Sequence, residues 1–307
     1  MKYTFDNIIK LNNINSIEYL ISPCSPYFIC NHYISTEIHY GQKKFIKANL
    51  KIKANDLLKN KNYNDIKNYD IIQIQVDHFD YFLENVLPII EIKNLKIIII
   101  TSQWQLPQIN KSIKTDNLLE HKNILLWISQ NPIYSDNEKY MAIPYGFNHL
   151  YLDKYIQFVK SCNINQDKRQ KIVNLYASPH SHLPKDHIRI VHDIFGKNSG
   201  IQMEYNDFLK NILDSEFVIS TAGDRDDCFR HYECIGLNTI PVSNISGGYK
   251  EIFGLDMVYS NSEDMIEMIK SNTVNYNYKK PNREILTNHY WFSKINEKIN
   301  KLKKSLK

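Results

Sequence analysis

Short apolar runs rich in β-branched residues alternate along the chain with longer segments of mixed polarity. In the first half these runs predict strands at residues 17–22, 69–77, 96–103, 124–129 and 140–144. In the second half they predict strands at residues 172–178, 201–205, 217–221, 239–243 and 256–260. Helix-length segments lie between them at residues 187–195, 206–215 and 262–271. This alternation is typical of parallel sheets joined by helical crossovers.

A polar stretch at residues 152–171 separates the first group of predicted strands from the second. We therefore predict an α/β protein with two Rossmann-like domains whose parallel sheets face a central cleft. The first predicted domain is residues 1–155 and the second is residues 156–285. Residues 286–307 are predicted to form a C-terminal helix that packs back on the first domain.

The segment 215–244 combines a buried strand, a loop and a short helix in an order typical of ligand sites. The strand ends in Thr221, Ala222 and Gly223, an acidic loop follows, and a helix is predicted at residues 227–237. In open α/β sheets, ligands bind beyond the carboxyl ends of the strands. Helix N-termini at that edge favour phosphate groups, and Gly223 would let the backbone approach a ligand closely.

The predicted helix has two different faces. Cys228, Tyr232 and Ile235 recur at spacing that places them together on an inward face. Arg230 and Glu233 lie on the opposite face, where two interpretations are open. They form either a surface ion pair worth a few tenths of a kcal/mol, or a cation for a diphosphate beside a carboxylate for ribose hydroxyls. Spacing alone favours the surface pair.

The same segment resembles the donor-binding region of exostosin-like glycosyltransferases. That region has a buried strand, a Gly-containing loop, an Asp, Arg-x-x-Glu, and then Gly-x-x-Pro followed by an apolar residue. The corresponding residues here are 217–220, Gly223, Asp227, Arg230, Glu233, Gly236 and 240–242, with four residues instead of two between Gly236 and Pro241. Weaker resemblance to related viral and microbial glycosyltransferases extends over much of residues 70–295. The match departs at Cys228 and Phe229 and in the extra acidic residues of the loop.

The resemblance implies a GT-B fold, a nucleotide-sugar donor and no requirement for a bound metal. It implies that Arg230 contacts the donor phosphates and Glu233 the ribose, with Gly223 and Asp227 in the loop against the diphosphate. In the resembling proteins the region that matches 185–189 carries a basic residue toward the donor, and His187 and Arg189 are both candidates here. We take Arg189 for this role.

Two further positions at strand ends are candidates for chemistry. Ser178 ends the predicted strand 172–178 and is a candidate hydrogen-bond donor to the nucleotide sugar. Asp77 and His78 end the strand 69–77, and either is a candidate general base for the acceptor hydroxyl of an inverting enzyme. If the strand continues through them they point to opposite faces, so only one could serve. A solvated acidic strand end is the alternative, and a retaining enzyme needs no such base.

Two sequence patterns could bind a metal, but we do not predict a metal site. Asp224 and Asp226 form the Asp-x-Asp pattern of manganese-dependent glycosyltransferases, and two such carboxylates would suit a hard cation. The neighbouring Arg-x-x-Glu pattern favours the metal-independent architecture instead. His180 and His182 lack a third ligand at useful spacing. We predict neither a metal nor a cofactor.

Composition narrows the protein class. Hydrophobic residues make up 43% of the chain and charged residues 23%, which is ordinary for a globular protein and excludes a disordered chain. The net charge of +5 is dispersed and accompanies no nucleic-acid-binding motif, so no nucleic-acid partner is predicted. Five scattered cysteines without a Cys-x-x-Cys pair and no signal-peptide pattern predict a cytoplasmic protein, in the host cytoplasm if its source is a virus.

The last segment predicts an amphipathic basic helix. Ile295, Ile299, Leu302 and Leu306 share one helical face, and lysines occupy the other. A helix that covers the first domain is the favoured interpretation. Peripheral contact with an anionic membrane is the alternative.

Taken together, these patterns predict a glycosyltransferase that moves a sugar from a nucleotide-sugar donor to a glycan or protein-linked acceptor. A UDP-sugar is preferred over a GDP-sugar. Two alternatives are kept. One is a polysaccharide pyruvyl transferase-like enzyme, whose donor has no ribose and leaves Glu233 without a role. The other is a non-catalytic glycan- or nucleotide-binding protein on the same scaffold.

Overall fold

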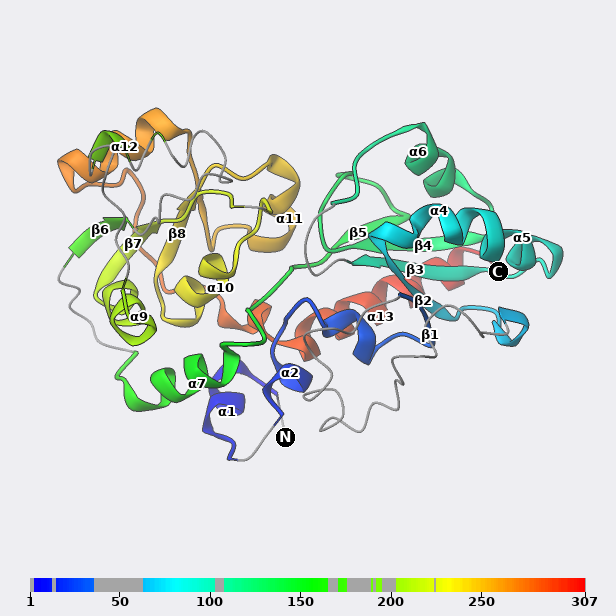
Figure 1. Cartoon of the computed structure of the whole chain (residues 1–307), viewed down its shortest axis with the longest axis horizontal. Helices are drawn as coiled ribbons and strands as arrows, with labels where there is room; N and C mark the ends of the chain where they lie inside the picture. The colour runs from blue at the N-terminus through cyan, green and yellow to red at the C-terminus, as the bar shows by residue number, and fades with distance from the viewer. Residues whose placement is uncertain are drawn as a thin grey trace. The chain divides into compact units, whose positions relative to one another are not determined.

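The chain divides into two compact units, each built around its own sheet (Figure 1). The computed structural model describes residues 3–12, 15–35, 63–102, 108–164, 171–175, 189, 192–194, 203–223 and 225–306. Unit 1 consists of Met1–Asn12 and Gly146–Thr287, and unit 2 of Asn13–Tyr145 and Asn288–Lys307.

Unit 2 contains a five-stranded sheet in which every pairing is parallel. Its strands, in spatial order, are β1 (His32–Ile34), β2 (Ile71–Gln75), β3 (Ile97–Ser102), β4 (Ile124–Ser129) and β5 (Tyr140–Ala142). The helices are α2 (Ser16–Tyr19), α4 (Phe79–Tyr81), α5 (Leu87–Ile92), α6 (Ile113–Glu120) and α13 (Asn288–Ser305), with a π-helical turn at Phe82–Val86. Short 3-10 helices lie at Ser25–Phe28, Tyr63–Asp65 and Val76–His78.

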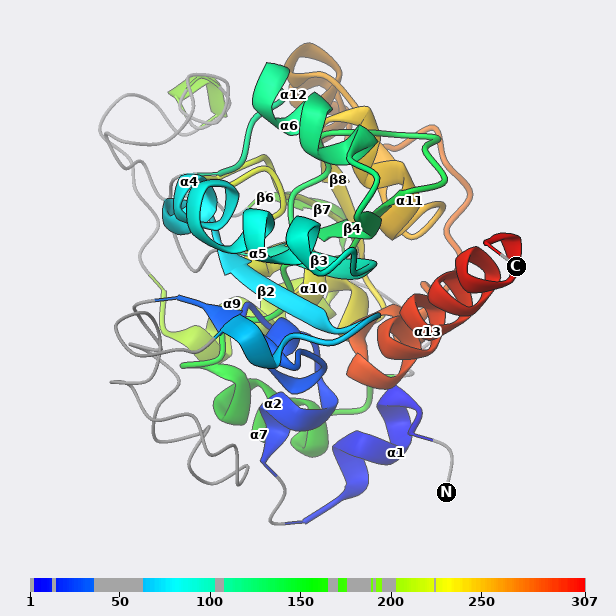
Figure 2. The ribbon, with the colours of Figure 1, turned by 90° about the vertical axis from the view of Figure 1, so that its right-hand side faces the viewer.

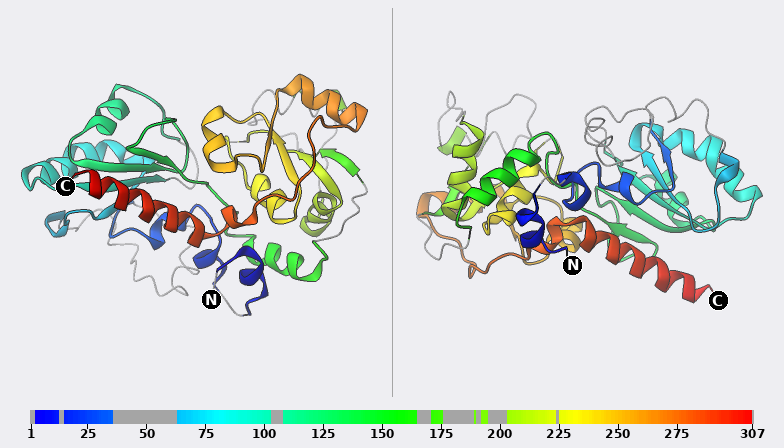
Figure 3. Two further views of the ribbon diagram at one scale, coloured as in Figure 1. Left: turned by 180° about the vertical axis from the view of Figure 1, so that it is seen from behind. Right: turned by 90° about the horizontal axis from the view of Figure 1, so that it is seen from below.

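Helices cover both faces of this sheet. Figures 2 and 3 show α4 and α5 over one face and α13 along the other, and α13 contacts β4. All residues of β3 and β4 are buried, which is why their sequences are apolar without alternation. The first residue of α13 ties it to α2, because the Asn288 side chain donates to the carbonyls of Ile17 and Glu18.

Unit 1 contains a four-stranded sheet, also parallel throughout its described pairings. Its strands are β6 (Lys171–Leu175), β7 (Ser215–Ile219), β8 (Ile240–Ser243) and β9 (Val258–Tyr259). Its helices are α1 (Phe5–Lys10), α7 (Leu152–Ser161), α9 (Tyr205–Leu213), α10 (Phe229–Gly236), α11 (Lys250–Phe253) and α12 (Ser262–Ser271). Two 3-10 helices lie at Gly247–Tyr249 and Arg283–Leu286.

The core of unit 1 also has helices on both faces of its sheet. Phe217 and Ile219 of β7 form a buried cluster with Met265 of α12. On the other side, α9 contacts β7 and α10 contacts β8, as Figure 1 shows. The two parallel sheets with their helical crossovers confirm the predicted α/β class.

Two predicted strands are wrong. Residues 16–19 form α2, because an apolar run of this length is compatible with a short helix as well as with a buried strand. In the predicted strand 201–205, Met203 and Glu204 are not in a strand and Tyr205 begins α9. The other predicted strands coincide with β2 to β9, with ends shifted by a few residues.

The division into units differs from the predicted boundaries at residues 1–12 and at α7. Residues 1–12 belong to unit 1, where α1 contacts α7 and Arg283 forms an ion pair with Asp6 at 2.7 Å. The whole of α7 also belongs to unit 1, because it packs against α1 and α9. Residues 288–307 group with the sheet of unit 2.

Candidate active site

The loop between β7 and α10 lies at the carboxyl edge of the parallel sheet of unit 1, where ligands bind in such folds. Cys228 is the residue that precedes α10, and its backbone N–H donates to His231 Nδ1 at 3.1 Å. His231 is fully buried, and its Nε2 donates to the carbonyl of Ser220 at 2.7 Å. The imidazole therefore joins the first turn of the helix to the end of the preceding strand.

Asp227 anchors the same loop from inside the unit. It is completely buried, and both of its carboxylate oxygens accept hydrogen bonds from tyrosine hydroxyls. Tyr232 donates to Oδ2, and Tyr249 donates to Oδ1 at 3.3 Å. The carboxylate that the resemblance assigned to the diphosphate loop thus holds the loop in place in this structure.

Gly223 lies at an open position in this loop. Its backbone N–H donates to the carbonyl of Arg225 at 2.9 Å. A side-chain carbon added at this position would have only ordinary contacts, the nearest being the Cβ of Cys228 at 3.8 Å. The fold itself therefore does not require a glycine at 223.

Glu233 is the buried acid of the site. Its side chain is 6% exposed, and Oε1 accepts a hydrogen bond from the Tyr205 hydroxyl at 2.6 Å. Burial raises the pKa of Glu233 from 4.5 to about 7, although the Tyr205 hydrogen bond and the nearby Arg230 act in the opposite direction. The other carboxylate oxygen has no hydrogen-bond partner among the described residues.

Arg230 lies half-buried one turn earlier on α10. Its guanidinium carbon is 5.8 Å from the centre of the Phe208 ring, and its Nε has no hydrogen-bond partner in the part of the chain that the structure describes. No ion pair joins it to Glu233 among the described residues. The surface-pair interpretation is therefore wrong: one side chain is buried, and the two are not paired.

Tyr205 and Phe208 are parts of this site that were not predicted from the sequence. Both lie on α9, which contacts α10. Tyr205 contacts Glu233, and Phe208 contacts Arg230. Their spacing of three residues places them on one helical face, and that aromatic pair in an amphipathic helix was the available signal. Nothing in the sequence indicated which other helix this face meets.

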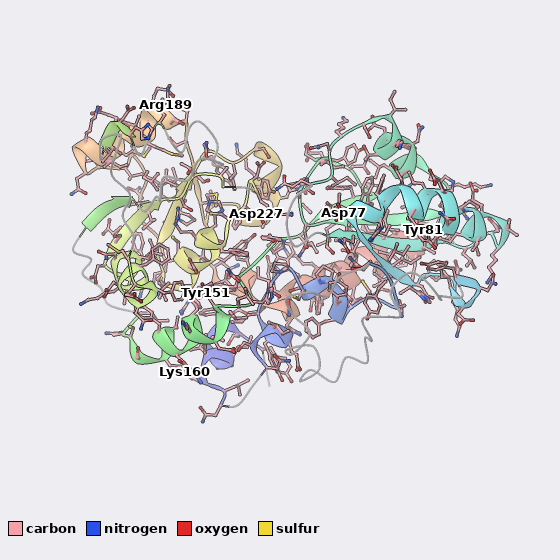
Figure 4. All side chains as sticks on the ribbon, viewed as in Figure 1. Asp77, Tyr81, Tyr151, Lys160, Arg189 and Asp227 are labelled. Carbon is pink, nitrogen blue, oxygen red and sulfur yellow. The ribbon has the colours of Figure 1, made fainter. Side chains whose placement is uncertain are left out.

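Of the remaining predicted donor contacts, the structure describes Arg189. Arg189 is exposed and forms an ion pair with Glu263 of α12 at 2.7 Å. Figure 4 labels Arg189 and Asp227 at separate places in unit 1. Ser178 lies outside the described residues, as does Asp224 of the Asp-x-Asp pattern. Within the described ranges, no three His, Cys, Asp or Glu side chains come together as a metal site.

The candidate bases lie at the carboxyl edge of the sheet of unit 2. Strand β2 ends at Gln75, and Val76–His78 form a 3-10 helix, so the alternation expected of a continuing strand does not apply. Asp77 is exposed, and its Oδ2 accepts a hydrogen bond from Gln75 Nε2 at 3.1 Å. Figure 4 labels Asp77 at the start of this turn. His78 is half-buried.

The C-terminal helix uses most of its apolar face within unit 2. Ile295 and Ile299 are buried, Leu302 is half-buried and Leu306 is exposed. On its polar side, Lys298 donates to the carbonyl of Tyr140. This burial supports the covering-helix interpretation. Among the described helices, none combines the length and the apolar character needed to cross a bilayer.

Comparisons with known proteins give only distant similarity. No protein-family model matches the chain, and no curated protein matches it. A crystal structure of a GtfA/B complex is similar with a TM-score of 0.37 and 9% identity over 76% of this chain. This chain spans 58% of that protein's length. A crystal structure of an α1,3-fucosyltransferase is similar with a TM-score of 0.40 and 11% identity, over 88% of this chain and 89% of that one. Neither similarity is close enough to assign an activity.

Proposed function

We propose that this chain is a glycosyltransferase of the GT-B type, with a nucleotide-sugar donor and a glycan or protein-linked acceptor. A UDP-sugar is the preferred donor. One observation carries the proposal: α10 presents Arg230, which forms no ion pair among the described residues, and the buried carboxylate of Glu233 one turn apart, at the ligand-binding edge of a parallel sheet.

Glu233 suits the ribose of a nucleotide. A buried carboxylate is costly unless hydrogen-bond donors surround it, and Tyr205 supplies only one of them. The two vicinal hydroxyls of a ribose are donors of the required kind. Bound there, they would satisfy the second oxygen of Glu233 and stabilise its ionised form.

Arg230 suits the diphosphate. The first backbone N–H groups of α10 and the positive end of its dipole favour an anion at the same end of the helix. As the bond between the anomeric carbon and the diphosphate breaks, negative charge develops on the departing oxygen. In this proposal the guanidinium of Arg230 and the N–H groups at the start of α10 would stabilise this charge in the transition state.

The acceptor half of the reaction is assigned to unit 2. In an inverting transfer, the acceptor oxygen forms a bond to the anomeric carbon while its proton passes to a base, for which Asp77 and His78 are the candidates. No step requires a metal. Arg189, in an exposed ion pair, and Asp227, bonded by two tyrosines, are given no direct contact with the donor in this proposal.

Thermal-shift binding tests the donor site. The panel contains UDP, GDP, CMP and their sugars, each with and without EDTA, against the wild type, Glu233→Ala, Glu233→Gln and Arg230→Ala. Glu267→Ala is the matched control, because it removes an exposed glutamate from α12 of the same unit. A nucleotide at a hundred times its Kd should stabilise the wild type and the control by about 2.7 kcal/mol.

We expect one nucleotide class to stabilise the protein, with the effect lost in the Glu233 and Arg230 variants and unchanged by EDTA. Stabilisation that survives in both Glu233 variants contradicts the ribose role and favours a donor without ribose, as in a pyruvyl transferase. Binding without release of nucleotide from any sugar donor favours a non-catalytic binding protein. No stabilisation by any nucleotide rejects the donor site.

A further inference from the structure

A chain of hydrogen bonds runs through buried polar side chains of unit 2 and ends on Asp77. Ser35 follows β1, and the parallel register of β1 and β2 brings it beside Gln75. Ser35 Oγ donates to Gln75 Oε1 at 2.7 Å, and Gln75 Nε2 donates to Asp77 Oδ2 at 3.1 Å. At the other end, the Tyr27 hydroxyl lies 3.2 Å from Ser35 Oγ.

These hydrogen bonds can run in only one direction from donor to acceptor. An amide oxygen cannot donate, so the single hydroxyl proton of Ser35 is used toward Gln75. The Tyr27 hydroxyl must then be the donor to Ser35. Turning the Gln75 amide around would place its oxygen against the carboxylate of Asp77, where two acceptors repel each other. The network therefore presents an N–H group to Asp77 and cannot present an acceptor.

All residues of this hydrogen-bond network except Asp77 are buried. Ser35 is fully buried, Tyr27 and Gln75 are each 8% exposed, and Asp77 is exposed at the carboxyl edge of the sheet. Buried hydrogen bonds hold their members in fixed orientations more strongly than exposed ones, because water does not compete for them. A carboxylate accessible to solvent is thus held at one oxygen by a rigid internal network.

We propose that Gln75 and Ser35 are positioning residues for Asp77, and that Asp77 rather than His78 is the base that accepts the proton of the acceptor hydroxyl. The assignment of Asp77 as a base rests on the proposed transfer reaction. The hydrogen bond from Gln75 limits rotation of the carboxylate, so less reorganisation is needed when the proton is transferred.

A second glutamine in β2 provides a matched control for Gln75. Gln73 is also buried and lies on the same face as Gln75, two residues earlier. It donates to Ser102 Oγ at 3.0 Å instead of to an acid. Gln75→Met can therefore be compared with Gln73→Met, and Ser35→Ala with Ser102→Ala. Each pair removes the same groups from buried positions.

The first measurement is steady-state release of UDP from UDP-sugars, with p-nitrophenyl glycosides as acceptors. Gln75→Met and Ser35→Ala should lower kcat about 10-fold or more while KM for the UDP-sugar changes by less than about 2-fold. Ser35→Thr keeps the hydroxyl and should restore most of kcat. The two control variants should stay within about 2-fold of the wild type. Equal losses in the controls, or an unchanged kcat in Gln75→Met, would overturn the positioning role.

A double-mutant cycle tests the network without any need for activity. Ser35→Ala and Asp77→Ala are combined, and the unfolding equilibrium constant of each variant is measured in urea. Because Gln75 links the two residues, their combined effect should differ from the product of the single effects by about 3-fold or more. The difference should disappear in a Gln75→Met background. Multiplicative effects would overturn the network, whereas coupling in a protein without transferase activity rejects the proposed function alone.

Discussion

The carboxylates of Asp227 and Glu233 differ in how many of their oxygens are hydrogen-bonded within the fold. Asp227 has both carboxylate oxygens bonded by tyrosines, so its hydrogen-bonding capacity inside the fold is used. Glu233 receives one such bond and keeps an oxygen without a partner among the described residues. The first arrangement stabilises the loop, and the second leaves a polar group that a ligand can satisfy.

Glu233 should make stability depend on pH in the direction opposite to that of a salt-bridged acid. Its pKa is raised from 4.5 to about 7, chiefly by burial. Between these two pH values the folded chain keeps a proton that the unfolded chain loses. The free energy of unfolding should therefore fall by up to about 3 kcal/mol as pH rises through this range. Urea unfolding at about pH 5 and about pH 8 measures this fall.

Glu233→Gln should remove the fall, because the amide carries no charge at either pH. A variant with the same pH dependence as the wild type would show that other groups cause it. A nucleotide that satisfies the ionised carboxylate should also reduce the fall in the wild type, since the bound ribose would replace the missing hydrogen bonds.

At the scale of elements, the site depends on how closely α10 approaches α7. A side-chain carbon at Gly236, the last residue of α10, would lie 2.1 Å from the hydroxyl oxygen of Tyr155 and 3.2 Å from the Phe5 ring. The Tyr155 hydroxyl in turn donates to the backbone carbonyl of Glu233 at 3.1 Å. Gly236 therefore allows a helix contact that supports the backbone of the candidate carboxylate.

Gly236→Ala should destabilise unit 1 by about 1–3 kcal/mol, because the added methyl group overlaps a tyrosine that is fully buried. Gly247→Ala is the control, since no atom lies within 4 Å of the corresponding position there. Urea unfolding measures both variants. Combining Gly236→Ala with Tyr155→Phe should cost less than the sum of the two single changes, and strict additivity would argue against the overlap.

At the scale of the whole molecule, each unit includes a segment from the far end of the chain. Residues 1–12 complete unit 1, and residues 288–307 complete unit 2. Phe5 and Ile8 of α1 are fully buried, so the first helix is part of the core that supports α7 and α10. A change near residue 5 should thus affect a site more than two hundred residues away in the sequence.

Phe5→Ala should cost about 3–5 kcal/mol in unit 1, the usual effect of removing a buried aromatic side chain. Hydrogen exchange should show lost protection in peptides from α7 and α10 and unchanged protection in β3 and β4. Tyr3→Ala is the control, because Tyr3 is 41% exposed. Loss of protection confined to β3 and β4 would contradict the assignment of residues 1–12 to unit 1.

The amino-acid sequence was enough to predict the α/β class and the positions of β3, β4, β7 and β8, because strands covered on both faces are mostly apolar. It also determined that Arg230 and Glu233 share a helical face. It did not distinguish a strand from a helix at residues 17–22, because a short apolar run fits either element.

The hydrogen-bond partners of the acids could not be predicted in this way. Tyr205 bonds the buried Glu233, two tyrosines bond Asp227, and Gln75 bonds Asp77. Hydrophobic spacing records which face of an element avoids water, and this information is local. Whether a polar side chain on such an element meets a donor, an acid or solvent depends on residues that folding brings from distant parts of the chain.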